Sequence, residues 1–341
     1  MMLTPQHVSL IVPVYNGGKH WTRVLDALSA LNPAPGEIIV VDDGSTDQSS
    51  ALARARGLNV LTTPLARGGP AIARNIGAAH AQGDVLFFID ADVLVKPDAI
   101  ARITNALSDA NLSAIFGAYD DAPGDAAFVS QYRNLLHHYV HQTSNENASS
   151  FWAGCGAIRR RAFNELGGFA AEYGRPSIED IELGNRIKKA GGHIRLAKDL
   201  QVKHLKRWTL RSLIVTDIRD RALPWAELIA RQGELPADLN LKISHRLSAV
   251  LCWLLLAAIF AGIVSPLFWF AALALVFGLL ALNFDLYRFL FQRRGAWFVA
   301  RAIPLHWLYY VYSSATFAYV ILFRARFSKP PAQPTASKHH A

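Results

Sequence analysis

The strongest constraint on the fold is a run of 36 residues, Ala249–Phe284, that contains no acidic or basic side chain. One membrane-spanning helix needs only ~20 apolar residues, so this run is too long for a single span. Ser265-Pro266 lies at its midpoint, and proline begins a helix more readily than it continues one. The sequence therefore predicts a membrane hairpin of two helices, roughly Leu247–Val264 and Leu267–Asn283. A buried core helix is the weaker alternative.

A third candidate span, Ala302–Phe323, is rich in tyrosine and contains Trp307, residue types typical of membrane interfaces. The loop between the second and third candidate spans carries four arginines and is therefore predicted to be cytoplasmic by the positive-inside rule: Arg288, Arg293, Arg294 and Arg301. A third crossing would place the basic residues after Phe323 outside, which the same rule disfavours. The third segment is therefore a span, an interfacial or re-entrant helix, or a core helix.

The charge of the chain is unevenly distributed along its length. The net charge is +9, made up of −5 over residues 1–150, +7 over 151–246 and +7 over 247–341. A basic excess beside an apolar segment favours a membrane surface or an anionic ligand, and the acidic N-terminal half argues against nucleic acid. No signal peptide is predicted at the N-terminus, so the first, catalytic domain is expected on the cytoplasmic side.

Short apolar segments alternate with helical ones before the membrane region. The expected strands are Val8–Val14, Glu37–Asp42 and Asp84–Asp90, and the expected helices are Lys19–Ala30, Thr46–Ala55 and Gly69–Ala81. Continuous rather than alternating apolar strands are typical of a parallel sheet that is covered on both faces. The sequence therefore predicts an α/β nucleotide-binding fold with a mostly parallel central sheet.

Polar groups follow each of these strands, where open α/β sheets bind their ligands. The first strand runs into Tyr15-Asn16, the second into Asp42-Asp43 with a Gly-Ser-Thr-Asp continuation, and the third into Asp90-Ala91-Asp92. Turns and helix caps use the same residue types, but three clusters at matching ends favour one crevice. Two carboxylates at one strand end suit Mg²⁺ or Mn²⁺ together with substrate phosphates.

In their order and spacing over about residues 8–205, these motifs resemble family 2 glycosyltransferases of the GT-A fold. The segments that carry the resemblance are Val8–Asn16, the Asp42–Asp47 run, Gly69–Gly77, Asp90–Asp92 and Glu179-Asp180. The resemblance implies a nucleotide-diphosphate sugar donor and inversion at the anomeric carbon. It also implies a divalent metal, Mg²⁺ or Mn²⁺.

The resemblance also assigns roles to individual residues. It places Pro13, Tyr15, Asp42 and Asp43 around the base and ribose of the nucleotide. Asp92, with Asp90, would meet the metal and diphosphate, and Arg74 would lie beside the donor. His204, which ends a strand-like segment, is either a further metal ligand or a structural histidine.

Glu179-Asp180 opens a helix expected over Ile178–Ala190. The resemblance assigns Asp180 as the base that deprotonates an acceptor hydroxyl, with Glu179 as second choice; stabilisation of the helix N-terminus is the alternative. A polyprenyl phosphate acceptor is already ionised and needs little help from a base. The acidic pair therefore favours a hydroxyl on a lipid-linked or glycan acceptor, with transfer to polyprenyl phosphate as an alternative.

Two aromatic features are ambiguous in sequence. Trp152 would either stack on a sugar or fill the core, and His137, His138 and His141 are expected on a polar helix face.

The sequence thus predicts a multi-pass cell-membrane glycosyltransferase that contacts membrane lipids. A GT-A domain is expected over 1–206, an amphipathic interface region over 207–246, two or three membrane helices over 247–327, and a disordered tail over 328–341. The alternative from a different functional class is a non-catalytic scaffold that binds nucleotides at the membrane. Such a scaffold would need neither Asp92 nor Asp180, and the sequence contains both.

Overall fold

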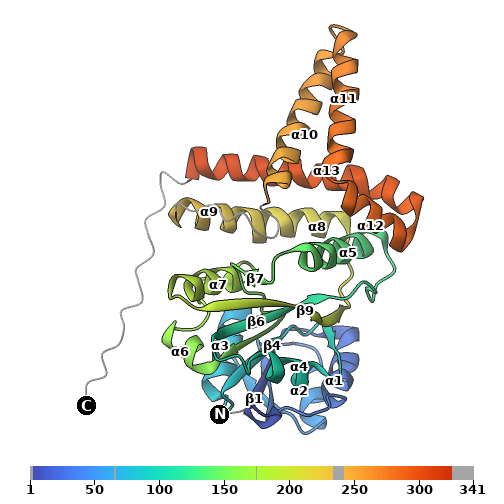
Figure 1. The fold of residues 1–341 in the computed structure, drawn as a ribbon. Coiled ribbons are helices and arrows are strands. Elements are labelled where there is room, and N and C mark those ends of the chain that lie inside the picture. The colour runs from blue at the N-terminus through green and yellow to red at the C-terminus, as the bar shows by residue number, and fades with distance from the viewer. Residues whose placement is uncertain (1–2, 65–66, 174, 233–241, 325–341) are drawn as a thin grey trace.

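The computed structural model describes residues 3–64, 67–173, 175–232 and 242–324. The tail predicted for 328–341 lies outside the described residues. An α/β domain occupies the N-terminal part of the chain, and a set of long helices covers one side of it (Figure 1).

Four parallel strands form the first half of the central sheet. In sheet order they are β3 (Asn59–Thr62), β2 (Glu37–Asp42), β1 (Val8–Val14) and β4 (Val85–Ile89). The helices α1 (Trp21–Ser29), α2 (Ser49–Ala55) and α3 (Pro70–His80) connect them, as right-handed crossovers between parallel strands require. Every residue of β1 and β4 is buried, which explains their uninterrupted apolar sequences.

The second half of the sheet is mixed rather than parallel. Beyond β4 the order continues through β8 (Cys155–Arg159), β6 (Leu112–Tyr119), β9 (His193–His204) and β5 (Val93–Val95), while β7 (Asn147–Ala148) pairs with β9. Strand β8 runs antiparallel to both of its neighbours, and β5 runs antiparallel to β9. The prediction of a mostly parallel sheet is therefore correct for the first four strands. In the second half β6 also runs parallel to β9, and the prediction is wrong for β8, β5 and β7, which pair antiparallel with their neighbours.

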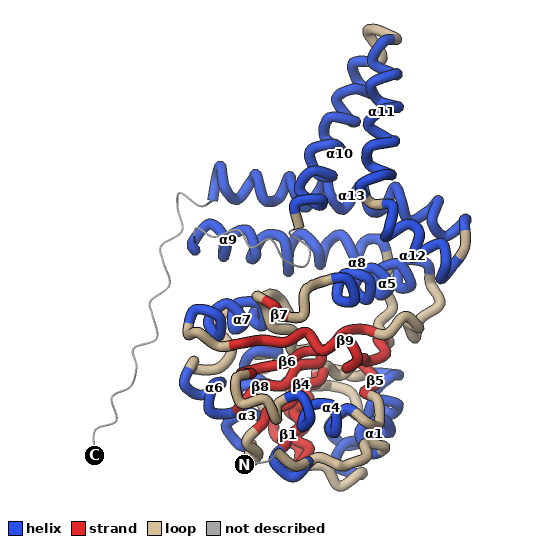
Figure 2. The backbone as a smooth tube through the Cα atoms, in the orientation of Figure 1, coloured by secondary structure: helices blue, strands red, loops and turns tan. Residues whose placement is uncertain are grey.

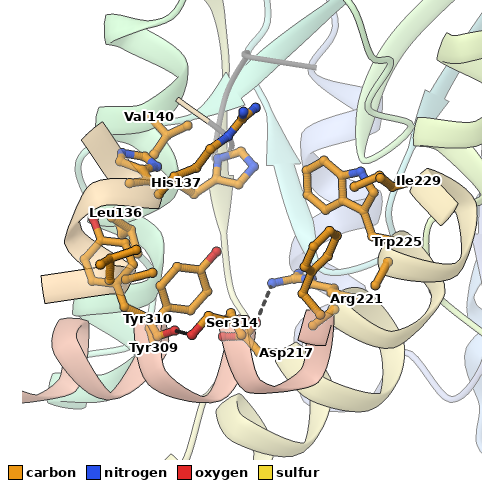
Figure 3. A pocket seen from close by; sticks show the side chains of 18 of the residues that line it. Leu136, His137, Val140, Asp217, Arg221, Trp225, Ile229, Tyr309, Tyr310 and Ser314 are labelled. Atoms are coloured by element: carbon orange, nitrogen blue, oxygen red, sulfur yellow. Dashed lines mark hydrogen bonds and ion pairs between the residues drawn. The ribbon is translucent and has the colours of Figure 1, made fainter. Parts of the chain in front are cut away.

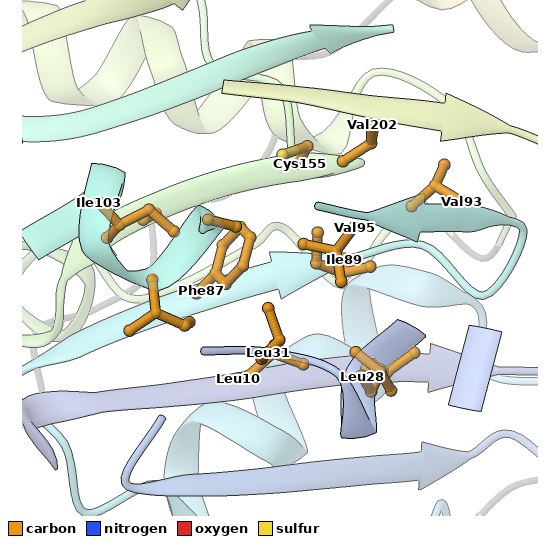
Figure 4. Packing of buried hydrophobic residues seen from close by; sticks show 14 of the residues in the cluster. Leu10, Leu28, Leu31, Phe87, Ile89, Val93, Val95, Ile103, Cys155 and Val202 are labelled. Atoms are coloured by element: carbon orange, nitrogen blue, oxygen red, sulfur yellow. The ribbon is translucent and has the colours of Figure 1, made fainter. Parts of the chain in front are cut away.

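Two apolar cores lie on opposite faces of the sheet. One packs α1 and α4 (Ala99–Ala106) against it, and Figure 4 shows Phe87 and Ile89 of β4 beside Leu28 and Ile103 of these helices. The other packs α3, α6 (Arg160–Glu165) and α7 (Glu179–Lys189) against the opposite face. The short turns η1 (Pro5–His7) and η2 (Gly18–His20) precede β1 and α1.

Long helices form a second layer above the α/β domain (Figures 1 and 2). Helix α5 (Phe128–Thr143) lies next to the sheet. A nearly continuous helix follows, made of α8 (Leu210–Val215), the π-helical segment η3 (Thr216–Ala222) and α9 (Leu223–Gln232). Helix α13 (Ala296–Tyr319), extended by η5 (Val320–Arg324), lies along α8 and α9.

The predicted hairpin is present as α10 (Ile243–Ala261) and α11 (Leu267–Leu282), which project away from the rest of the molecule (Figure 1). Among the described residues, α10 is the one unbroken helix long and apolar enough to cross a membrane. A second crossing requires α11 and α12 (Phe284–Arg294), bent by 69°, to count as one broken span. Only 22% of the apolar window of α10 is buried, and Phe260, Val264 and Phe270 are 69%, 88% and 73% exposed. A core helix would be mostly buried, so this surface requires another covering.

The third predicted span, unlike the hairpin, packs against the rest of the molecule. Helix α13 crosses the base of the hairpin, packs against α10, α12 and η3, and contains Pro304 within its length. It is not among the helices that meet the criteria for a span. The arginine-rich stretch before it is also a helix rather than a loop. Arg293 forms an ion pair of 2.9 Å with Asp121, and Arg294 donates to Gln131 Oε1 at 2.8 Å. These contacts attach the end of α12, the helix that follows the hairpin, to the segment after β6 and to α5.

Candidate active site

Arg74 joins two acidic residues that are distant in the sequence. Its guanidinium donates to Glu179 Oε1 at 2.8 Å and to Asp90 Oδ1 at 2.7 Å. Helix α3 supplies the arginine, the end of β4 supplies Asp90 and the start of α7 supplies Glu179. Burial alone would lower the pKa of Arg74, but the two carboxylates together raise it, so the side chain is a permanent cation here.

Asp180 lies beside this cluster because α7 approaches the preceding loop closely. A Cβ on Gly184 would come within 2.4 Å of the backbone nitrogen of Phe151, so only glycine permits this packing. The contact brings the first turn of α7 to the loop before β8, where the amide of Ala153 donates to Asp180 Oδ2 at 3.1 Å. The amide of Ile181 donates to the other oxygen at 2.8 Å.

The surroundings of Asp180 raise the pKa of its side chain well above the usual value for aspartate. Burial and the negative charge of Glu179 raise the pKa of Asp180 to about 7, although Arg74 and the two backbone amides act in the opposite direction. A carboxylate with a pKa near neutrality is suited to accept a proton in catalysis, because it is both ionised at pH 7–8 and basic enough. Helix α7 begins at Glu179, so the acidic pair also benefits from the helix dipole.

Asp92 and His204 form a second pair at the carboxyl end of β4. Antiparallel pairing of β5 with β9 sets Val93 opposite His204, and His204 Nε2 lies 3.5 Å from Asp92 Oδ2. Burial raises the pKa of Asp92, but His204 and Lys206 more than offset this, and the net shift is downward. The His204 ring stacks on Tyr119 with centroids 4.3 Å apart.

The donor set at this pair fits a divalent cation that substrate phosphates help to hold. A carboxylate and an imidazole suit Mn²⁺, and such ions are commonly held by one or two protein ligands plus phosphates and water. Among the described residues no group of three or more histidine, cysteine, aspartate or glutamate side chains is placed to hold a metal. Asp90, the other predicted ligand, accepts a hydrogen bond from Arg74 through Oδ1.

Asp42 ends β2 and Asp43 follows it, at the same edge of the sheet. Asp42 Oδ1 accepts from the amide of Ser45 at 3.0 Å, which shapes the turn that follows. Asp43 accepts from Thr63 Oγ1 and from the amides of Gly68 and Gly69, at 2.9, 2.9 and 2.8 Å. Gly69 has φ of 90°, a conformation that favours glycine, and α3 begins at the next residue. Asp43 thus fixes the start of the helix that carries Arg74.

Tyr15 follows β1 and remains partly exposed, whereas Pro13 is buried within the strand. Arg67, which the sequence analysis did not single out, donates through Nε to the Tyr15 hydroxyl at 2.6 Å and lies over its ring at 4.9 Å. Its position one residue before the Gly68-Gly69 pair was the available signal. The pair of side chains offers an aromatic ring and a cation beside Asp42 and Asp43.

A group of aromatic rings separates the α/β domain from the helical layer. Trp152 packs edge-to-face against Tyr119 at 5.0 Å and contacts His137 at 4.8 Å and His141 at 5.7 Å. The histidines of α5 were expected on a polar surface, and that expectation is wrong. His138 and His141 are buried and their Nδ1 atoms contact the carbonyl oxygens of Tyr119 and Gly117, because α5 is covered on both sides.

Comparison with known proteins agrees with this geometry. Residues 9–167 match the sequence model of glycosyl transferase family 2. An O-antigen chain rhamnosyltransferase from Salmonella typhimurium is 27% identical over 222 residues, which are 60% of this chain and 68% of the relative. An undecaprenyl-phosphate 4-deoxy-4-formamido-L-arabinose transferase from Edwardsiella ictaluri is 29% identical over 160 residues, 45% of this chain and 48% of the relative. Several other curated relatives are covered over less than half of their length.

Among solved structures, the mannosyltransferase PcManGT from Pyrobaculum calidifontis, in complex with GDP-Man and Mn²⁺, superposes with a TM-score of 0.61. The match covers 92% of this chain and 87% of that protein at 20% identity, so it is a similarity of fold. The sheet, the acidic clusters at its carboxyl edge and the sequence match over 9–167 lead to one conclusion. Residues 9–167 match glycosyl transferase family 2, and the fold is similar to that of solved GT-A glycosyltransferases.

Proposed function

We propose that the chain is an inverting, membrane-anchored glycosyltransferase that moves a sugar from a nucleotide-diphosphate donor to a hydroxyl of a lipid-linked or glycan acceptor. The observation that carries this proposal is the Asp180 carboxylate, which two backbone amides hold in place next to the cluster of Arg74, Asp90 and Glu179, surroundings that also raise its pKa. A catalytically silent scaffold has no need of a base tuned in this way.

In the proposed reaction the acceptor oxygen attacks the anomeric carbon as the bond from that carbon to the diphosphate breaks. The bonding electrons leave with the nucleotide diphosphate, and the hydroxyl proton passes to the Asp180 carboxylate. Two backbone amides fix the orientation of that carboxylate, and Arg74 keeps the neighbouring Glu179 in place. Attack from the face opposite the leaving group gives inversion.

The donor would lie along the carboxyl edge of the sheet. Asp42, Tyr15 and Arg67 are positioned for the nucleoside, with Pro13 and Asp43 as the backbone support of that region. Asp92 and His204 would hold Mg²⁺ or Mn²⁺, which when bound supplies positive charge to the departing diphosphate. PcManGT was solved with GDP-Man and Mn²⁺, which supports this assignment of donor class and metal.

Membrane attachment would come from the α10–α11 hairpin, crossing twice with the catalytic domain on the cytoplasmic side. The support is the exposed apolar surface of the hairpin and the attachment of α12 to the α/β domain through Arg293 and Arg294. Both ends of the hairpin then lie on one side with the arginines, as the positive-inside rule requires. Helix α13 would lie in the interface.

Transfer to polyprenyl phosphate is the second candidate, because the Edwardsiella ictaluri relative is named for undecaprenyl phosphate. The two candidates differ in their need for a base. An ionised phosphate attacks without losing a proton, whereas a hydroxyl requires Asp180.

The decisive experiment incubates the purified full chain in detergent with a panel of nucleotide sugars, Mn²⁺ and a lipid extract. Glycolipid formation with inverted anomeric configuration, determined by NMR, supports the proposal, and retained configuration contradicts it. Loss of transfer on chelation with EDTA and recovery with Mn²⁺ tests the metal. No transfer with any donor, together with tight nucleotide binding, would favour the scaffold.

A further inference from the structure

The imidazole of His204 needs a fixed orientation if it is to bind a metal. Its backbone is fixed, because His204 pairs with Val93 of β5 and its carbonyl oxygen accepts from the amide of Gly124 at 2.8 Å. The backbone does not fix the plane of the ring, since the torsion that turns a histidine ring has broad minima. Metal-ligating histidines are therefore usually oriented by a neighbouring group. The neighbour of His204 deserves identification for that reason.

The ring of Tyr119 lies flat against this imidazole. The two ring centroids are 4.3 Å apart and the ring planes differ by 9°. His204 is only 5% exposed, so the stacked rings are largely shielded from water. Among the described residues, Tyr119 is the one aromatic ring in contact with the His204 imidazole. A parallel ring at this distance restricts rotation of the imidazole, while His204 Nε2 faces Asp92 Oδ2 at 3.5 Å.

The register of β6 and β9 brings the two rings together. The strands are parallel, and Tyr119 lies opposite Val202 after a shift in register at Gly117. A Cβ on Gly117 would clash with the carbonyl oxygen of Leu200, so glycine permits the close approach of the strands at this irregularity. Side chains two residues apart on a strand share a face, so His204 follows Val202 on the face that carries Tyr119.

Tyr119 is itself held by the helical layer. Its carbonyl oxygen contacts His138 Nδ1 of α5 at 2.8 Å. Its ring contacts that of His137 with centroids 4.2 Å apart, and packs edge-to-face against Trp152 at 5.0 Å. Figure 3 shows His137 on the wall of a cavity of about 450 Å³ that α5, α9 and α13 help to form. The rings of Tyr119 and His137 thus connect the proposed metal pair with the helices that lead to the hairpin.

We propose that Tyr119 is a positioning residue for the metal, because its ring holds the imidazole of His204 in the orientation in which Nε2 binds Mn²⁺ or Mg²⁺ together with Asp92. The inference rests on the proposed function, which supplies the metal. The flat face of the ring is what Tyr119 contributes, and its hydroxyl is not required. Removing a group that orients a metal ligand usually costs ~10–100-fold in metal affinity.

The first measurement is the affinity of the purified full chain in detergent for Mn²⁺, by EPR titration with Mn²⁺ alone and with added GDP or UDP. Tyr119→Phe keeps a ring and should bind Mn²⁺ within about twofold of wild type, whereas Tyr119→Leu should bind it about tenfold more weakly or worse. Phe116→Leu is the matched control, since Phe116 is an aromatic residue of the same strand whose ring lies in the core on the opposite face. It should bind Mn²⁺ like wild type.

The second measurement reports on the imidazole directly. Pulsed EPR detects ¹⁴N nuclei bound to Mn²⁺, so wild type should show a signal that His204→Ala lacks. Tyr119→Phe should retain this signal, and Tyr119→Leu should lose at least half of it. A loss of stability does not explain such a pattern, because Phe116→Leu also removes buried atoms from the core and should keep the signal.

Each other outcome overturns the proposal. Wild-type affinity and signal in Tyr119→Leu would do so and leave the metal site standing, and an equal loss in Phe116→Leu would indicate a general effect on stability. An equal loss in Tyr119→Phe would assign the effect to the hydroxyl. If Tyr119→Leu does not fold, Tyr119→Met, which has a side chain of comparable size without a ring, takes its place.

The wild-type chain separates this proposal from the proposed function. Mn²⁺ binding without a ¹⁴N signal would exclude His204 as a ligand and overturn the role of Tyr119, while the metal-dependent reaction would stand. A wild-type chain that binds no Mn²⁺ in any of these conditions would reject both the role of Tyr119 and the metal assigned to the proposed function.

Discussion

Replacing Asp180 with asparagine should abolish transfer and at the same time stabilise the protein, in a manner that depends on pH. The pKa of Asp180 rises from its usual 3.8 to about 7 through burial and the charge of Glu179. A rise of about 3 in pKa corresponds to roughly 4 kcal/mol of unfavourable free energy in the ionised form. This is an upper bound, because asparagine also gives up bonds that the carboxylate accepts from Ala153 and Ile181.

The sign follows from the direction of the shift. Below about pH 4 the carboxyl group is protonated in both folded and unfolded chains, and it makes no pH-dependent contribution. As the pH rises toward 7 the unfolded chain loses this proton first, so wild-type stability falls until the folded pKa is passed. Asp180→Asn removes this loss. It should be more stable than wild type at pH 8 and equal to it near pH 4.

Thermal unfolding in detergent at pH 8 and near pH 4 measures the effect. Even 1 kcal/mol shifts Tm by about 2–4 °C in a domain of ~200 residues. Transfer by the variant should fall by about 10²–10⁴-fold, the usual contribution of a general base. Glu182→Gln is the matched control, since Glu182 lies on the same helix but pairs with Arg186. A variant that is less stable at pH 8, or that retains transfer within a few fold, would refute this account of Asp180.

Three other changes test the rest of the site. Wild-type transfer, measured at saturating donor, should rise about tenfold between pH 6 and pH 8, as a base with a pKa near 7 requires. Glu179→Gln should move this rise to lower pH, because it removes a like charge next to Asp180. An unshifted profile would show that Glu179 does not raise the pKa of Asp180. Arg74→Ala leaves Glu179 and Asp90 without their cation and should lower the free energy of unfolding by about 3–5 kcal/mol in chemical denaturation. The control Arg56→Ala removes an exposed ion pair with Asp26 and should change the free energy of unfolding by close to zero. Asp92→Asn should weaken nucleotide binding in calorimetry only when Mn²⁺ is present, and equal weakening in EDTA would argue against a metal role.

The sequence predicted the elements that depend on local pattern. Val8–Val14 and Glu37–Asp42 form strands over the expected residues, because a short continuous apolar run that ends in a polar turn is typical of a buried strand. The hairpin is also as expected, with its break at Pro266. The antiparallel strands in the second half of the sheet were not predicted, since the direction of β8 depends on how the chain returns to the sheet.

Within the site, sequence reasoning identified the acidic residues but not their partners. Arg74 was expected beside the donor. Its bonds to Asp90 and Glu179 join three segments that are distant in the sequence and meet only in the folded chain. Arg67 and Tyr119 were missed, because their contacts are with the rings of Tyr15 and His204, which only folding brings close to them. The histidines of α5 were misjudged for the same reason. Their polar spacing suggested solvent, but a second layer of helices covers them.

The contacts of Arg293 and Arg294 with the α/β domain have a consequence for how the protein meets its second substrate. If the hairpin lies in the bilayer, as proposed above, these contacts would hold the candidate active site at a fixed height above the lipid and restrict its rotation. Collisions with a lipid-borne acceptor then take place in two dimensions, so that turnover would follow the number of acceptor molecules per unit area of membrane. Diluting the same acceptor with inert lipid should slow the reaction even when its bulk concentration is unchanged.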